Sequence, residues 1–537
     1  MVGVAGRSIA CHTCKQRKIR CGGEKPTCSN CIKSGRSCAG YQRSHAFILS
    51  QYAVATNTEL SDTGFRLVDR NDPSPVLLSR WKRNLPDRSA IPSSRRRHLN
   101  RNITSPSPLV SMSPHNAFRD QLLHLFINGQ YPSDVISHAL VGPHRKWLLR
   151  LGSLPSLSPA LEYTILAVCT AWLGRRDKHV DLERKSLTLY TTGLRKLQRA
   201  IDSPTTQHDE QTLTACMALC MYEFTNCPGR TIEAYINHYH GAMELLRLRG
   251  AKAHSQGLSH GVFQALRMHA IFHGLGQRQA TFLAQPEWIE KPWETTPKDH
   301  HDLLMDLFLQ LPSILSKIDA LDNDDRPQQV AAGCAGILQG CLRFESNLGT
   351  WLSVFRVAAA GPLYWPELST TASETDSPEL GKLFPVSMCF PSFRVAETMV
   401  LFWTLRVLLH FHAYKIQQKL YAAQETVSEY YDETHGMSQY VVVDMTAQHF
   451  PPAEVLLPPL GHQEESYQTS ARYICQSVEY VSRIKPRNLG PNTMLPSLVV
   501  VRAILSIAPG DWARELAWVN ETLSRIQQMG TQLVGCI

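Results

Sequence analysis

Six cysteines lie close together near the start of the chain, in the segment CHTCKQRKIRCGGEKPTCSNCIKSGRSC. The residues between successive cysteines number two, six, six, two and six, so the unit C-x2-C-x6-C occurs twice. Zinc binds four thiolates in a tetrahedron, and six sulfurs give two ions four ligands each only if two sulfurs are shared. The first cysteine of each unit, Cys11 or Cys28, is the natural shared ligand. We therefore expect two zinc ions, with the ligands Cys11, Cys14, Cys21, Cys28, Cys31 and Cys38.

Four cations occupy the six positions between the second and third cysteines, and we expect them in a short helical turn: Lys15, Arg17, Lys18 and Arg20. A basic helix held by metal can enter the major groove of DNA while neighbouring cations neutralise phosphates. Contact of Lys or Arg with guanine is the commonest direct readout of a base. The metal spacing and the charge pattern together predict binding to double-stranded DNA.

Other interpretations of the cysteines are possible. The chain opens MVGVAGRSIACHTC, and the absence of a signal-peptide-like apolar run argues against a secreted disulfide knot. The usual iron–sulfur spacings differ from this one. A zinc module that binds only protein, with its basic run as a solvated face, is the remaining alternative.

The positive charge of the chain is concentrated in its first part. The first 110 residues contain 19 Lys and Arg against 6 Asp and Glu, whereas the remainder contains 36 against 40. This asymmetry indicates a nucleic-acid-binding segment attached to a body of ordinary composition.

At the cysteine segment the sequence resembles the fungal binuclear zinc cluster transcription factors. All six cysteine spacings match, and the pair RK before I-R-C stands where that family carries its base-reading residues. The resemblance implies that Lys18 contacts a CGG-type triplet with help from Arg17, and that Arg17 and Arg20 chiefly hold phosphates. It also implies that Pro26 shapes the loop between the two units. Gly22 departs from the family, which often has aspartate after the third cysteine, so the local turn can differ.

Composition divides the rest of the chain in two. Stretches such as IPSSRRRHLN and ITSPSPLVSMSP predict a flexible basic linker at 46–115, between a zinc module at 1–45 and a body at 116–537, because their low apolar content cannot offset the entropy of ordering. Residues 42–60 lack the sustained heptads of a coiled coil. The protein can therefore be a monomer or a homodimer that forms through the large domain.

The body is predicted to be an all-α domain. Leu161, Ile165, Val168 and Trp172 recur at helical intervals, and further helices are expected at 261–284, 300–320, 328–358, 393–432, 466–484 and 497–530. The best strand signal is VVVDM at 441–445. The order of AWLGRRD, SLTLYTTGLRKLQRAI, DEQTLTACMALCMYEF and LLRLRG resembles the fungal-specific transcription factor domain. That resemblance implies a helical, regulatory domain.

The remaining candidate site residues favour structural roles. Cys216 and Cys220 lie one turn apart among apolar residues, which favours burial over metal binding. His238 and His240 are two residues apart and point to different faces of a helix, and His300 and His301 stand at an expected helix start. No G-x-S-x-G, P-loop or H-E-x-x-H motif is present, so we do not expect an enzyme.

These observations predict a nuclear, zinc-dependent regulator of RNA polymerase II genes that binds DNA and the transcription machinery. The resemblance favours an activator of a metabolic or secondary-metabolite pathway, with a repressor or a protein-binding adaptor as alternatives. The longest apolar stretches are interrupted by Arg406 and Arg502, so no membrane span is expected.

Overall fold

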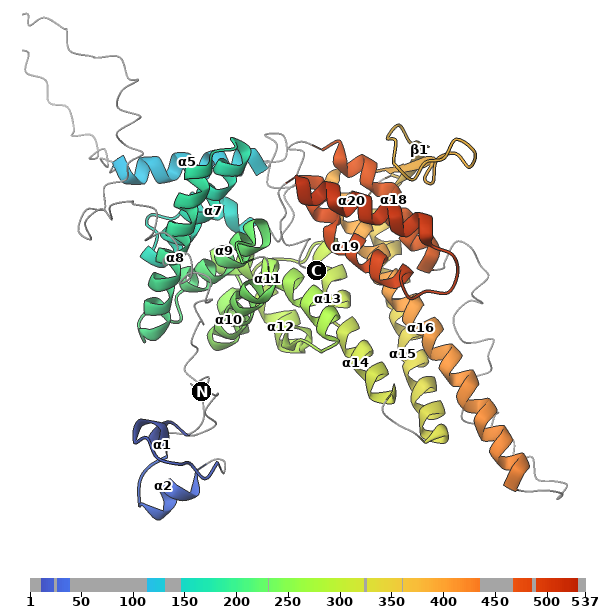
Figure 1. Cartoon of the computed structure of the whole chain (residues 1–537), viewed down its shortest axis with the longest axis horizontal. Coiled ribbons are helices and arrows are strands. Elements are labelled where there is room, and N and C mark those ends of the chain that lie inside the picture. Colours follow the sequence, from blue (N-terminus) through green and yellow to red (C-terminus); the bar gives the residue numbers. More distant parts are fainter. Residues whose placement is uncertain are drawn as a thin grey trace, which may run out of the picture. The chain divides into compact units, whose positions relative to one another are not determined.

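The computed structural model describes residues 11–23, 27–38, 114–130, 146–229, 231–322, 326–359, 361–434, 467–484 and 489–529 (Figure 1). Helices dominate these ranges and are accompanied by one two-stranded sheet, which confirms the all-α prediction. The α-helices are α1 (His12–Gln16), α2 (Ser29–Lys33), α5 (Pro114–Gln130), α6 (Lys146–Leu151), α7 (Pro159–Arg176), α8 (Val180–Asp202), α9 (Glu210–Asn226), α10 (Glu233–Arg249), α11 (Gly257–Gln277), α12 (Pro286–Glu290), α13 (His300–Phe308), α14 (Leu311–Asp322), α15 (Pro327–Ala358), α16 (Phe393–Thr434), α18 (Tyr467–Ser482), α19 (Leu489–Leu505) and α20 (Ala513–Gln528). Short 3-10 turns lie at Ala251–His254, Phe282–Ala284 and Lys291–Trp293.

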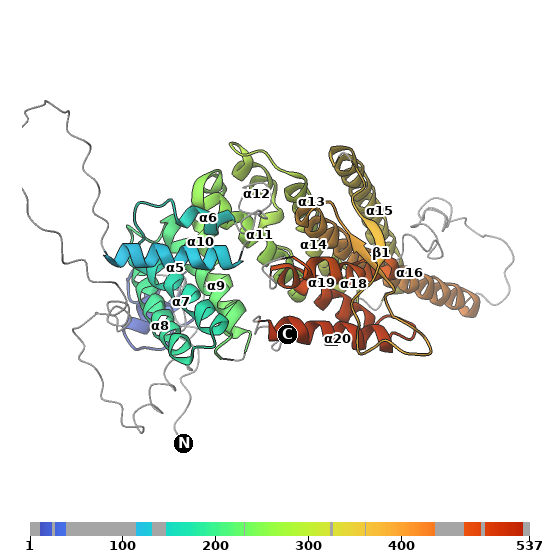
Figure 2. The ribbon, with the colours of Figure 1, turned by 90° about the horizontal axis from the view of Figure 1, so that it is seen from above.

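The first part of the body comprises the helices from α5 to α11. Its helices α7 and α8 pack together, and both views show them side by side (Figures 1 and 2). Helix α7 begins with Ser158, whose hydroxyl accepts from the backbone N–H of Leu161, and a proline follows at the first helical position, where its missing N–H is harmless. A Cβ at Gly193 would lie 2.8 Å from Cγ2 of Thr164. Glycine at this position therefore permits the two helices to approach.

The second part of the body contains the long helices α15 and α16, which run alongside each other, and α18, α19 and α20, which pack together (Figure 2). Strands β1 (Trp365–Leu368) and β2 (Val386–Cys389) pair antiparallel, with Trp365 opposite Cys389. Strand β2 packs on α18. The loop between the strands is held by hydroxyl-to-carboxylate hydrogen bonds, from Ser369 to Glu479 on α18 at 2.7 Å and from Ser373 to Glu521 on α20 at 2.6 Å.

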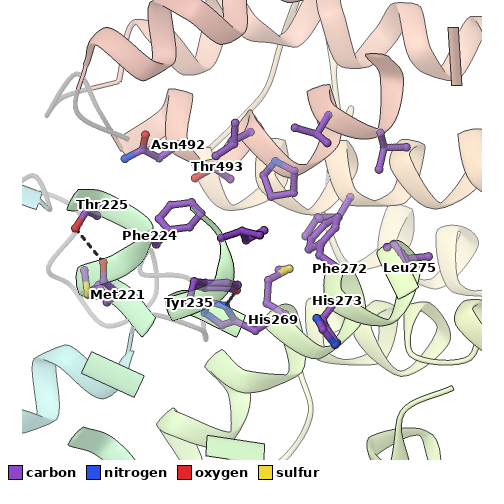
Figure 3. A pocket seen from close by; sticks show the side chains of 18 of the residues that line it. Met221, Phe224, Thr225, Tyr235, His269, Phe272, His273, Leu275, Asn492 and Thr493 are labelled. Atoms are coloured by element: carbon purple, nitrogen blue, oxygen red, sulfur yellow. Dashed lines mark hydrogen bonds between the residues drawn. The ribbon is translucent and has the colours of Figure 1, made fainter. Parts of the chain in front are cut away.

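A cavity of about 1090 Å³ opens between these two parts of the body. Its walls come chiefly from α9, α10 and α11 on one side and from α19 on the other (Figure 3).

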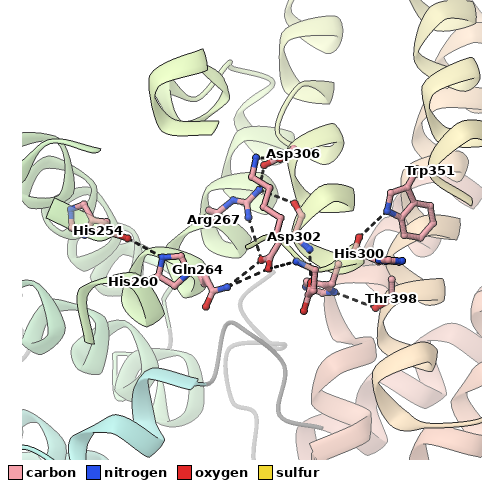
Figure 4. Close-up of polar contacts among 12 residues, drawn as sticks. His254, His260, Gln264, Arg267, His300, Asp302, Asp306, Trp351 and Thr398 are labelled. Carbon is pink, nitrogen blue, oxygen red and sulfur yellow. Dashed lines mark hydrogen bonds and ion pairs between the residues drawn. The ribbon is translucent and has the colours of Figure 1, made fainter. Parts of the chain in front are cut away.

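Helix α13 connects the two parts through buried polar contacts (Figure 4). Arg267 of α11, whose side chain is 1% exposed, pairs with Asp302 and Asp306 of α13. From the other side, Trp351 of α15 donates its indole N–H to the carbonyl oxygen of His300 at 2.8 Å. Because a buried guanidinium needs carboxylate partners in fixed positions, this network sets how α11 and α13 lie against each other.

Several elements differ from the sequence-based expectations. The segment expected as one helix at 497–530 forms α19 and α20, separated by a break at 506–512 that contains Gly510 with φ +114°. The small sheet was not foreseen, because its strands are only four residues long. The first body helix begins at Pro114 rather than at 116. The expected strand at 441–445 and almost the whole linker at 46–115 lie outside the described residues.

A buried polar cluster between α8, α9 and α10 contains an acid in an unfavourable setting. The hydroxyl of Tyr190 donates to Oε1 of Glu223 and also contacts Nε2 of His238 at 2.9 Å. The other carboxylate oxygen, Oε2, has no hydrogen-bond partner among the described residues. Burial raises the pKa of Glu223 to about 7, although the bond from Tyr190 opposes the shift. Its charged form therefore opposes folding.

This cluster predicts a measurable pH dependence of stability. Between the unfolded pKa of 4.5 and the folded value of about 7, the folded chain holds more protons, so Glu223 makes the protein less stable as pH rises through this interval. Glu223→Gln removes the charge. We expect the free energy of unfolding of the variant, relative to wild type, to increase by about 2–3 kcal/mol from pH 5 to pH 8, measured by urea unfolding followed by tryptophan fluorescence.

Glu345 supplies a control of opposite sign. Burial alone would raise the pKa of Glu345, but His410 and Arg406 beside it lower the pKa below the usual value. Glu345→Gln should therefore reduce stability at pH 8. A difference between Glu223→Gln and wild type that stays constant with pH would contradict the assignment to Glu223.

Candidate metal centre and DNA-binding interface

The structure brings the six N-terminal cysteines together in two overlapping groups. One group contains Cys11, Cys14, Cys21 and Cys28, the other contains Cys11, Cys28, Cys31 and Cys38, and the sulfur atoms within each group lie within 4.8 Å of one another. Cys11 and Cys28 are common to both groups, and their sulfurs are 3.6 Å apart. The geometry is therefore that of two four-sulfur sites with two shared members.

The repeated sequence unit produces a repeated local structure. The second unit follows the first at an interval of 17 residues, and each first cysteine stands immediately before a five-residue helix, α1 or α2. Sγ of Cys11 accepts from the backbone N–H of Cys14 at 3.4 Å, and Sγ of Cys28 accepts from that of Cys31 at 3.3 Å. Each shared sulfur thus also satisfies an N–H at a helix start, where negative charge is favoured.

The two units also hold each other through matching hydrogen bonds. The side chain of Thr13 donates to the carbonyl oxygen of Ser37 at 3.3 Å, and the equivalent side chain of Asn30 donates to the carbonyl oxygen of Arg20. The helix of one unit therefore supports the segment before the last cysteine of the other. The relation between the halves is close to a twofold symmetry.

Both helices end in the same way, with one difference that concerns Lys18. The backbone N–H of Ile19 reaches the carbonyl oxygen of Cys14 at 3.1 Å, and Arg36 repeats this contact in the second unit at 3.0 Å. The residue before each is left-handed, Lys18 with φ +53° and Gly35 with φ +60°. Glycine adopts this conformation freely, but lysine does so at a cost of about 1 kcal/mol.

The basic segment differs in part from its prediction. The expected helical turn across residues 15–20 is wrong beyond Gln16, because α1 ends there and Lys18 turns the chain out of the helix. Arg17, Lys18 and Arg20 are all exposed, as a surface that meets DNA requires. The side chain of Lys15 and the whole of Pro26 lie outside the described residues.

The donor set fits zinc. Burial is the largest cause that raises the pKa of the Cys14 thiol to about 12, and neighbouring sulfurs of Cys28, Cys31 and Cys21 add to it. Several thiols packed this closely cannot ionise together without a cation between them. A divalent ion that prefers four thiolates, as zinc does, satisfies this requirement.

The other candidate residues take structural positions. Cys216 and Cys220 are 0% and 1% exposed in the core, which confirms their predicted burial, and no group of metal-ligating side chains other than the two sulfur groups occurs among the described residues. His238 is buried and His240 is exposed, so they do face different ways. Helix α13 begins at His300 as expected, with Asp299 as its N-cap.

Comparison with known proteins matches both parts of the chain. The profile of the fungal Zn(2)-Cys(6) binuclear cluster domain matches residues 9–46, and that of the fungal specific transcription factor domain matches residues 103–434. An uncharacterized protein of Emericella nidulans is 29% identical over 133 residues, which is 25% of this chain and 28% of that protein. A putative transcription factor of Aspergillus rugulosus is 34% identical over 73 residues, covering 14% and 12% of the two chains. White-opaque regulator 2 of Candida albicans is 56% identical over 32 residues, covering 6% and 7%.

The aligned segments are short in relation to these proteins, since the chain spans 28% and 12% of the first two relatives. No solved structure matches the chain significantly. No helix in the described ranges is long and apolar enough to cross a bilayer.

The cysteine cluster and the two matched profiles define a protein that combines a zinc cluster domain with a fungal specific transcription factor domain. The chain belongs to the fungal transcription factors that carry a Zn(2)-Cys(6) cluster and a fungal specific transcription factor domain.

The backbone at Lys18 predicts an unusual effect on stability. Lys18→Gly should stabilise the zinc module by about 1 kcal/mol, because glycine adopts the left-handed conformation without penalty, and Gly35→Ala should destabilise it by a similar amount. The measurement is the concentration of a chromogenic chelator that removes half of the zinc from the full-length protein. Lys33→Ala, which removes a cation from α2 without changing a left-handed residue, is the control and should shift this concentration little. A Lys18→Gly variant that loses zinc more readily than wild type would show that the lysine side chain, not its backbone, governs the module.

Proposed function

We propose that the protein is a nuclear activator of RNA polymerase II genes that reads CGG-type triplets in the major groove through a two-zinc module. The observation that carries this proposal is the pair of four-sulfur groups sharing Cys11 and Cys28, beside an exposed basic segment. Each zinc would take four thiolates, with these two cysteines as bridges. The proposed protein is a non-enzymatic regulator, and its control of a metabolic or secondary-metabolite pathway rests on the family resemblance.

Lys18 is the proposed base-reading residue. It is exposed and occupies a left-handed position that its counterpart, Gly35, fills at no conformational cost. Retaining lysine at a position that favours glycine supports a role for its side chain. Arg17 and Arg20 are exposed on either side and are proposed to hold phosphates, and Lys15 is proposed to do the same from α1. The alternative functions are those of a repressor and of an adaptor that binds protein instead of DNA.

Zinc content tests the bridging arrangement. Cys28 belongs to both sulfur groups and Cys38 to one. Cys28→Ser should therefore lose both zinc ions, whereas Cys38→Ser should retain more zinc than Cys28→Ser. Metal per chain is measured by mass spectrometry of the purified full-length proteins. Cys216→Ala, in the core of the body, is the control and should keep two. Two zinc ions per chain in Cys28→Ser would contradict the shared-ligand arrangement.

Selection of bound sequences from a random DNA pool tests the DNA contacts. Full-length protein with zinc should enrich a CGG-containing site, and a chelator should abolish the enrichment. Lys18→Gly should lose discrimination between the selected site and a scrambled one, although its module remains folded. Lys33→Ala should keep the discrimination and bind both sequences somewhat more weakly.

The selected sites also report the stoichiometry and the alternatives. One triplet would indicate a monomer, and two triplets at fixed spacing would indicate a homodimer. A zinc-loaded protein that enriches no sequence would contradict the proposed DNA recognition and favour the adaptor. Loss of target transcripts on deletion distinguishes an activator from a repressor, for which the transcripts would rise.

A further inference from the structure

A cavity lies between α9–α11 and α19 in the body. It has a volume of about 1090 Å³, slightly above the usual range of sites for small organic ligands. In Figure 3, Phe224, Tyr235 and His269 lie on one side, and Asn492 and Thr493 lie on the other. Both walls are formed by helices of the body, so the cavity does not involve the zinc module.

The walls are mainly apolar. Aliphatic and aromatic side chains face the cavity from both sides, among them Phe224, Ile236, Phe272, Val499 and Val500. All five are only half-buried. Apolar surface that neighbouring helices leave uncovered around a concave space is characteristic of a binding site. An apolar ligand in this space would remove that surface from water.

The wall also offers a hydrogen-bonding site without a charge. The hydroxyl of Tyr235 lies 2.5 Å from Nδ1 of His269. Burial lowers the pKa of His269 to about 4, so the imidazole is neutral at physiological pH. Burial likewise lowers the pKa of His412, which also lines the cavity, to about 4. These groups suit hydroxyl or carbonyl groups of a ligand, and they offer no positive charge to an anion.

The arginines at the cavity already have partners. Arg175 donates to the carbonyl oxygen of Thr225 and to the side chain of Asn226, both at 2.5 Å. Arg176 and Arg278 pair with carboxylates of Asp177 and Asp319, each at 2.7 Å. An anionic ligand would compete with carboxylates already in place at Arg176 and Arg278, and it would itself lose hydration in an apolar space. A neutral ligand incurs neither penalty.

We propose that this cavity binds one neutral, predominantly apolar small molecule between α9–α11 and α19. The combination of a concave volume, two apolar walls and arginines that already have hydrogen-bond or carboxylate partners fits such a molecule better than a charged metabolite or a basic or acidic peptide. The ligand would contact both parts of the body at once. This site is independent of the proposed DNA contacts, so it can be tested without DNA.

The test uses full-length, zinc-loaded protein and the neutral dye Nile red, whose fluorescence rises and shifts to the blue in apolar surroundings. We expect saturable binding of one dye per chain. Two variants fill the cavity from opposite walls, Ile236→Trp and Val500→Trp, and each should weaken dye binding at least about tenfold. The matched control is Val357→Trp, which adds the same side chain at an 84% exposed position of α15 outside the cavity and should bind like wild type. Circular dichroism and the thermal midpoint identify any variant that does not fold.

Displacement of the dye from wild-type protein tests the charge preference without relying on variants. Decanol and decanoate have the same chain length and differ in charge at pH 7.5. Decanol should displace Nile red at a concentration at least about tenfold lower than decanoate. The proposal is overturned if wild type shows no saturable dye binding, if both folded cavity variants bind like Val357→Trp, or if decanoate displaces the dye as readily as decanol.

Discussion

The zinc module depends on the convergence of its sulfur atoms. Among the residues of this module whose burial is described, only Cys11, Cys14, Cys28 and Cys31 are buried. The isoleucines in the described part of the module, Ile19 and Ile32, are 40% and 64% exposed. A segment this short cannot bury enough apolar surface to offset the entropy of ordering, so bonds from metal to sulfur must supply the stabilisation. The helix starts belong to the same unit, because the shared sulfurs also accept their N–H groups.

The helical body depends on a different constraint, the burial of the Arg267 guanidinium. Arg267 lies between two carboxylates of α13, and Lys298 pairs with Asp306 at 2.6 Å from the other side. Removing either carboxylate would leave a buried charge uncompensated, so α11 and α13 can hardly shift independently. Since α11 also forms part of the wall of the cavity, the network indirectly fixes the shape of that space.

The sequence alone predicted much of this structure where its signal was periodic or chemical. The spacing of the cysteines foretold the shared pair seen in the sulfur groups, and helices such as α15 at 327–358 and α16 at 393–434 fall within a few residues of their expected ranges. Other features had no local signal. The four-residue strands are too short to show an alternation of apolar and polar residues. The end of α1 at Gln16 depends on the left-handed backbone conformation of Lys18, which lysine rarely adopts. The cavity and the partners of Arg267 arise from residues far apart in sequence, which no pattern along the chain brings together.

The near-twofold frame of the zinc module carries unequal surfaces. At the positions where the first unit has Arg17, Lys18 and Arg20, the second has Ser34, Gly35 and Ser37. The backbone therefore offers two almost interchangeable faces, and side chains alone make one of them strongly cationic. A duplicated scaffold of this kind acquires a direction without changing its architecture, because its charge distribution differs between two sides that the backbone makes nearly equivalent.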